Sequence, residues 1–119
     1  MTQMPDFKDT PDPRHELPKR RPSETLKIMN LDGRAIHLTI GYDPADPERP
    51  REVFYSAGFK SGSQIEFQIQ DACVMFSLLL QHGLRPEEIA KSLSRVEQAD
   101  GSMAYASVIG LIASSLIAE

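Results

Sequence analysis

Residues 52–83 constrain the fold more than any other part of this 119-residue chain. A β-like run at 52–57 leads directly into a Gly/Lys/Ser turn at 58–63. Ser63 and Glu66 have the spacing of a capping box, which predicts a helix over about 63–81. A strand that turns into a long helix indicates a mixed architecture in which helices cover a sheet.

The helix predicted at 63–81 begins amphipathic and becomes apolar on nearly all sides. The stripe expected to face inward consists of Ile65, Ile69, Ala72, Phe76 and Leu79. In the second half of the helix, Val74, Met75, Leu78 and Leu80 are expected to widen this stripe. A helix of this kind is buried in a core or in an interface. Gly83 is expected to supply the left-handed cap at its end.

Two further strands are predicted upstream, at about 24–31 and 34–41, because apolar and polar residues alternate there with period two. Asp32-Gly33 between them predicts a two-residue type I′ turn, and therefore a hairpin. Residues 42–50 hold three prolines and three acids and are predicted to form a loop. With the strand at 52–57, the hairpin predicts a three-stranded antiparallel meander.

Two more helices are predicted, at about 85–94 and 102–118. Pro86 suits the first turn of the first of these, and Ser102 is expected to cap the second. Residues 95–101 between them are polar and predicted to be a loop. The expected fold is thus α+β, a meander covered by three helices. The helices at 63–81 and 102–118 have more apolar surface than one small sheet can bury. This excess predicts tight packing between helices or a second copy of the chain.

Residues 1–22 carry five of the nine prolines and few large apolar residues. They are predicted to be an extended or disordered arm, with a single domain over 23–119. The basic end of the arm contains Arg14, His15, Lys19, Arg20 and Arg21. This end is a candidate docking arm for a partner or polyanion, and the alternative is a solubilising tail.

The turn before the long helix is a candidate anion site. Amides at a helix N-terminus attract phosphate groups, and a lysine adds a full charge. The residues concerned are Gly58, Lys60, Ser61, Gly62 and Ser63. The lysine falls between the glycines, so the string is not a P-loop. The alternative is a purely structural strand-to-helix turn.

Other chemistry has little support in the sequence. The three histidines lie far apart in the chain without an accompanying acid cluster, so no metal site and no cofactor is expected. Cys73, the only cysteine, is expected to be a buried small apolar residue, not a nucleophile. The formal net charge of −4 argues against a duplex-DNA binder. No signal peptide or membrane span is recognised, so a cytoplasmic protein is expected.

Several short motifs, taken in order, resemble the TSCPD-domain family, the accessory domain of cobalamin-dependent ribonucleotide reductases. The matching residues are Arg14-His15, Leu17-Pro18, Arg20-Arg21, Gly41, Glu52-Val53-Phe54, Gly58, Lys60, Gly62, Ser77-Leu78, Leu80, Gly83, Glu87-Glu88-Ile89 and Gly101-Ser102. The Thr-Ser-Cys-Pro-Asp string that names the family is absent, and Asp100-Gly-Ser-Met-Ala104 stands near its place.

The resemblance implies a free-standing accessory or regulatory module that binds a reductase, a nucleotide or a nucleic acid. The chain has one cysteine, whereas ribonucleotide reduction needs a radical-bearing cysteine and a reducing pair, so no catalysis is expected from it alone. The alternative function is a structural interaction module that homodimerises through its apolar helices.

Overall fold

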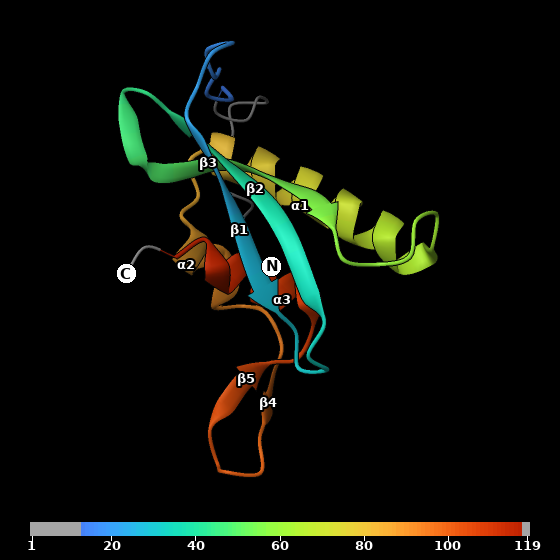
Figure 1. Ribbon diagram of the computed structural model, residues 1–119. Coiled ribbons are helices and arrows are strands. Elements are labelled where there is room, and N and C mark those ends of the chain that lie inside the picture. The colour runs from blue at the N-terminus through green and yellow to red at the C-terminus, as the bar shows by residue number, and fades with distance from the viewer. Residues whose placement is uncertain (1–12, 118–119) are drawn as a thin grey trace, which may run out of the picture.

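The computed structural model describes residues 13–117, which form an α+β fold (Figure 1). The elements in chain order are β1 (Ser23–Met29), β2 (Ala35–Asp43), β3 (Asp46–Ala57), α1 (Gln64–Gln81), α2 (Pro86–Ala90), β4 (Arg95–Glu97), β5 (Met103–Tyr105) and α3 (Val108–Ser115). The first three strands form an antiparallel sheet in the order β1-β2-β3. The predicted meander with three helices is therefore confirmed.

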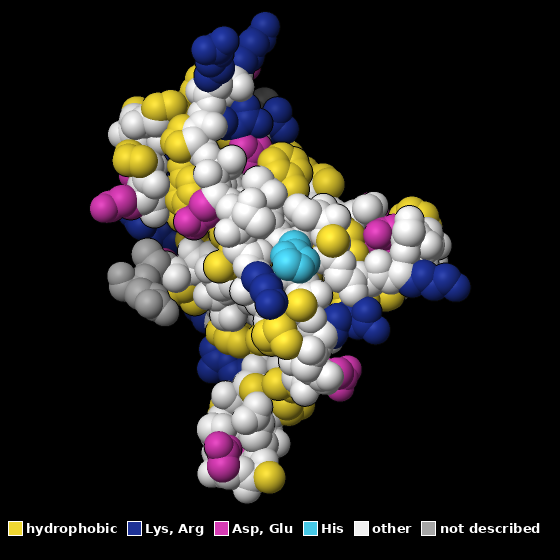
Figure 2. All heavy atoms as spheres, in the orientation of Figure 1, with side chains coloured by type: hydrophobic (Ala, Val, Ile, Leu, Met, Phe, Trp, Pro, Cys, Tyr) yellow, Lys and Arg dark blue, Asp and Glu magenta, His cyan; other side chains and the backbone are white. Residues whose placement is uncertain are grey.

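The core lies between one face of this sheet and the helices. Ile36, Leu38 and Ile40 alternate along β2 and are fully buried on the helix side. His37 and Thr39 lie on the opposite face, as alternation requires. Figure 2 views this outer face, where polar and backbone atoms predominate and hydrophobic side chains form separate groups. One face of the sheet is thus covered by helices and the other is open.

The hairpin of β1 and β2 is confirmed, but its predicted two-residue turn is wrong. The amide of Asn30 donates to the carbonyl of Arg34 at 3.0 Å, which leaves a three-residue loop. Gly33 closes this loop with a φ of 80°. The Asn30 side chain accepts from the amides of Asp32 and Arg34, at 3.0 and 2.8 Å, and so stabilises the wider loop.

The loop predicted at 42–50 is also wrong, because β2 and β3 extend through most of it. Pro47 and Pro50 both lie on β3. This strand is at an edge of the sheet, where proline is tolerated better than in a central strand. The pairing register shifts on both sides of Tyr42, which shows how the irregular segment is accommodated.

The C-terminal part differs most from prediction. A second hairpin, formed by β4 and β5, replaces the loop predicted at 95–101 and the start of the helix predicted at 102–118. Ser102 does not cap a helix. Its amide and hydroxyl bind the Asp100 carboxylate, at 2.9 and 2.5 Å, within the hairpin turn. The hairpin projects from the body of the protein (Figure 1).

Helix α3 begins six residues later than predicted, and Ser107 caps it. The Ser107 hydroxyl accepts from the amide of Gly110 at 3.1 Å. Helix α2 is shorter than the predicted 85–94, although Pro86 is its first residue, as expected. No helix in residues 13–117 is long and apolar enough to span a membrane.

Helix α1 begins and ends where the sequence predicts. The amide of Glu66 donates to the hydroxyl of the N-cap Ser63 at 3.2 Å. Gly83 has a φ of 104°, and the amide of Leu84 donates to the carbonyl of Leu79 at 3.1 Å. These bonds satisfy backbone groups that a helix end leaves unpaired.

The buried face of α1 is rotated relative to the predicted stripe. Ile65 and Leu79 were expected to point inward, yet they are 39% and 38% exposed. The buried residues are Ile69, Ala72, Cys73, Phe76, Ser77 and Leu80. The rotation arises because α1 contacts the edge strand β3 in addition to the core, and small or polar side chains face that edge.

Candidate functional site

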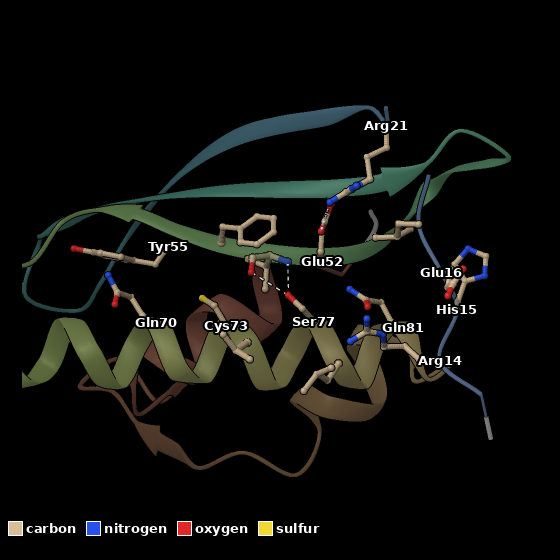
Figure 3. A pocket seen from close by; sticks show the side chains of 15 residues that line it. Arg14, His15, Glu16, Arg21, Glu52, Tyr55, Gln70, Cys73, Ser77 and Gln81 are labelled. Carbon is tan, nitrogen blue, oxygen red and sulfur yellow. Dashed lines mark hydrogen bonds and ion pairs between the residues drawn. The ribbon is translucent and has the colours of Figure 1, made fainter. Parts of the chain in front are cut away.

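A groove of about 650 Å³ runs between α1 and β3, with the N-terminal arm at one end (Figure 3). Its apolar lining includes Leu17, Val53, Phe54, Val74 and Leu78. Its polar lining includes Arg14, His15, Arg21, Glu52, Gln70, Ser77 and Gln81. A volume of this size is typical of ligand-binding clefts.

Side chains of α1 hold the helix alongside β3 by binding backbone groups on the outer edge of this strand. The Ser77 hydroxyl accepts from the amide of Val53 at 3.0 Å and donates to its carbonyl at 3.1 Å. The Gln81 amide donates to the carbonyl of Arg51 at 3.2 Å. Four helical residues advance roughly 6 Å and two strand residues roughly 7 Å, so the two spacings match. The helix thereby covers an edge that would otherwise be free to pair with another strand.

Cys73 precedes Ser77 by one turn of α1 and continues the same row. Its sulfur faces the backbone N–H of Tyr55, and the residue is 2% exposed. Burial raises the pKa of the Cys73 thiol to about 11. The expected buried state of Cys73 is confirmed, and a thiol with this pKa is a poor nucleophile near neutral pH.

The arm forms the end wall of the groove and is fastened to it by His15. The backbone amide of His15 donates to the carbonyl of Gln81 at 2.8 Å. Its Nε2 lies 2.6 Å from Oδ2 of Asp43. The amide of Ala45 and the His15 ring lower the pKa of Asp43. Asp43 falls in the loop predicted at 42–50, but it is the last residue of β2 and the arm covers most of its side chain.

Arg21 provides the second attachment of the arm. Its guanidinium binds both oxygens of the buried Glu52 carboxylate, with Nη2 at 3.0 Å from Oε1 and Nε paired with Oε2. A hydrogen bond to Glu52 raises the pKa of Arg21. Gly41 faces Glu52, and a Cβ there would lie 2.1 Å from Oε2. Glycine at this position therefore leaves room for the carboxylate.

The predicted docking arm is thus divided into fastened and free residues. His15 and Arg21 are held by carboxylates, whereas Arg14, Lys19 and Arg20 are exposed. Arg14 lines the groove and makes no hydrogen bond or ion pair with any residue from 13 to 117. Recruitment of a partner by these residues remains a prediction. Residues 1–12 of the arm lie outside the described part of the chain.

The predicted anion site at 58–63 uses several of its amides internally. The amide of Gly62 donates to the Glu66 carboxylate at 2.9 Å, and that of Ser63 to the Lys60 carbonyl at 3.1 Å. A Cβ on Gly58 would lie 2.9 Å from the carbonyl oxygen of Ala35, so this glycine permits a close approach of two strands.

Lys60 and Ser61 remain exposed in this turn, and anion binding there stays a prediction. The turn precedes the N-terminus of α1, whereas the arm is bound to Gln81 at the C-terminus of the same helix. The structure therefore does not bring the two predicted sites together.

A second surface continues from the groove along α1. Val74 and Met75 are 58% and 59% exposed, and Leu78 and Leu79 are about two-fifths exposed. Val74 and Leu78 also line the groove, whereas Met75 and Leu79 do not. These four residues are called the outer face of α1 below. An exposed apolar surface of this kind is typical of interaction sites.

Sequence reasoning missed the groove itself. The signal that could have revealed it is the row Cys73, Ser77 and Gln81, in which small or polar residues recur every four positions on an otherwise apolar helix. Such a row suits the open backbone groups of a strand edge better than a hydrocarbon core.

In residues 13–117 no three His, Cys, Asp or Glu side chains gather as metal ligands. No curated protein and no solved structure matches the chain. The TSCPD domain, which is associated with ribonucleotide reductases, matches residues 7–118. The match spans nearly the whole sequence, so this chain belongs to the TSCPD domain family.

Proposed function

We propose that this protein is a non-catalytic accessory module that binds a ribonucleotide reductase through the groove and the outer face of α1. The observation that carries the proposal is the exposure of large apolar side chains on a stretch of α1 that has no charged residue. Residues 72–81 contain no Asp, Glu, Lys or Arg. Exposed apolar surfaces rimmed by polar residues mark protein interfaces.

A protein partner suits this surface better than a small ligand. The groove alone has the volume of a small-molecule site. The apolar surface, however, continues to Met75 and Leu79, which lie outside the groove. A partner segment that fills the groove would cover these residues as well, with Arg14 available at the arm for an acidic group.

Binding to a purified cobalamin-dependent ribonucleotide reductase tests the proposal by calorimetry or biolayer interferometry. Met75→Glu places a charge on the outer face of α1 and should weaken binding at least tenfold. Met103→Glu is the matched control, because Met103 is also 59% exposed but lies on β5. Equal affinities for both variants, or no binding by the unmodified chain, would contradict the proposal.

A second candidate is self-association through the same face, making a homodimer. The specific observation that favours it is again the lack of charge at 72–81, because a two-fold interface then brings no like charges together. Sedimentation velocity over a hundredfold concentration range tests this candidate. A monomer at every concentration would exclude it, and a dimer that Met75→Glu alone dissociates would support it.

A further inference from the structure

Three arginines converge at the C-terminal end of α1. Arg49 and Arg51 belong to β3, and Arg85 follows α1 in the connection to α2. Nη2 of Arg49 donates to the carbonyl of Gly83 at 2.8 Å, and Nη1 of Arg51 donates to that of Leu80 at 3.3 Å. Both guanidiniums therefore lie against the last turn of the helix.

These three charges are poorly compensated. Within residues 13–117, none of the three arginines forms an ion pair with a carboxylate. The Nε atoms of Arg49 and Arg51 are buried and have no hydrogen-bond partner. Asp43 and Asp46 are the acids that act on Arg51, and Asp43 is already bound to His15. Burial lowers the pKa of Arg51, and the charges of Arg49 and Arg85 lower it further. Asp46 and Asp43 raise this pKa, but the net effect is a lowered value.

The helix itself compensates only part of this charge. A helix C-terminus carries roughly half a negative charge, whereas the cluster holds three full positive charges. Buried donors without partners are uncommon in folded proteins and often mark the place of an ion or ligand. Guanidinium groups bind phosphate oxygens in pairs of parallel hydrogen bonds, so a phosphate suits this cluster better than a monovalent anion.

We propose that Arg49, Arg51 and Arg85 form a binding site for a phosphate group, either free or carried by a nucleotide or a phosphorylated side chain. The site adjoins the arm end of the groove, where Gln81 donates to the carbonyl of Arg51, but it uses none of the four residues of the outer face of α1. The site lies at the C-terminal end of α1. The anion site that the sequence predicts, with Lys60, lies at the N-terminal end. A phosphate here would neutralise the cluster and strengthen the contact between β3 and the end of α1.

Thermal unfolding of the full chain in inorganic phosphate, against sodium chloride of equal ionic strength, tests the proposal. At phosphate about ten times its Kd, the Tm should rise by roughly 5 °C or more. Arg85→Gln should remove most of this rise, and Arg85 is exposed, so the variant should fold. Arg51→Lys keeps the charge but loses the planar fork, and should weaken binding several-fold.

Lys60→Gln is the matched control, since it removes one exposed cation at the other end of α1. The rise should persist in this variant. The proposal would be overturned if Arg85→Gln kept the full rise in Tm or if Lys60→Gln lost it. The absence of any rise in Tm in the unmodified chain would also overturn it. Adenosine monophosphate and a phosphoserine peptide, titrated separately, then distinguish the two carriers of the phosphate.

Discussion

The two faces of α1 have similar apolar side chains and opposite surroundings. On the inner face, Ile69, Phe76 and Leu80 are buried against the sheet and the other helices. On the outer face, Val74 and Met75 are more than half exposed. Apolar composition therefore does not decide burial along this helix. The row of side chains that binds β3 accompanies an orientation of α1 that leaves Val74 and Met75 outside the core.

The largest effect is expected from truncating the inner face. Phe76→Ala removes a ring that is 5% exposed, and should lower the free energy of unfolding by about 3–5 kcal/mol. Met75→Ala, at the neighbouring position, should change it by about 0.5 kcal/mol or less. Urea unfolding followed by circular dichroism measures both. Similar losses for the two variants would show that the outer face is covered in solution.

Thiol chemistry should separate the two faces next. Because the pKa of Cys73 is raised to about 11, its thiol stays protonated near pH 8 and becomes reactive only as the pH rises towards that value. Met75→Cys in a Cys73→Ala background should react with Ellman's reagent at least about a hundredfold faster than native Cys73. Comparable rates would mean that α1 opens or detaches from β3.

A smaller effect is expected from the row that binds the edge strand. Ser77→Ala leaves both backbone groups of Val53 without their side-chain partner, and should cost about 1–3 kcal/mol. Gln68→Ala on the exposed side of α1 is the control and should be close to neutral. Thermal and urea unfolding measure the difference. A neutral Ser77→Ala would indicate that packing alone orients the helix.

Local chemistry made the central part of the fold predictable. The capping pair Ser63 and Glu66 and the left-handed Gly83 fix the ends of α1 through contacts within a few residues. The alternation of Ile36, Leu38 and Ile40 fixes which face of β2 is buried. The same local reasoning failed at 42–50 and 95–105. Prolines are tolerated on an edge strand such as β3, and the short β4–β5 pair depends on its turn more than on periodicity.

The candidate site could not be predicted in the same way. His15 pairs with Asp43 across 28 residues of sequence, and Arg21 with Glu52 across 31. Neither pair has a spacing that local patterns reveal. The sequence predicted an anion site at Lys60, whereas the cluster of Arg49, Arg51 and Arg85 lies at the other end of the helix. Their convergence depends on β3 passing the last turn of α1.

The sequence by itself determined the α+β class, the central hairpin, the limits of α1 and the membership in the TSCPD domain family, because these depend on periodicity, caps and short motifs. Only the tertiary structure decided which side of α1 is buried, where the arm is fastened and which charges meet. Those features depend on the alignment of Ser77 and Gln81 with the edge of β3, and such an alignment exists only once helix and strand are placed together.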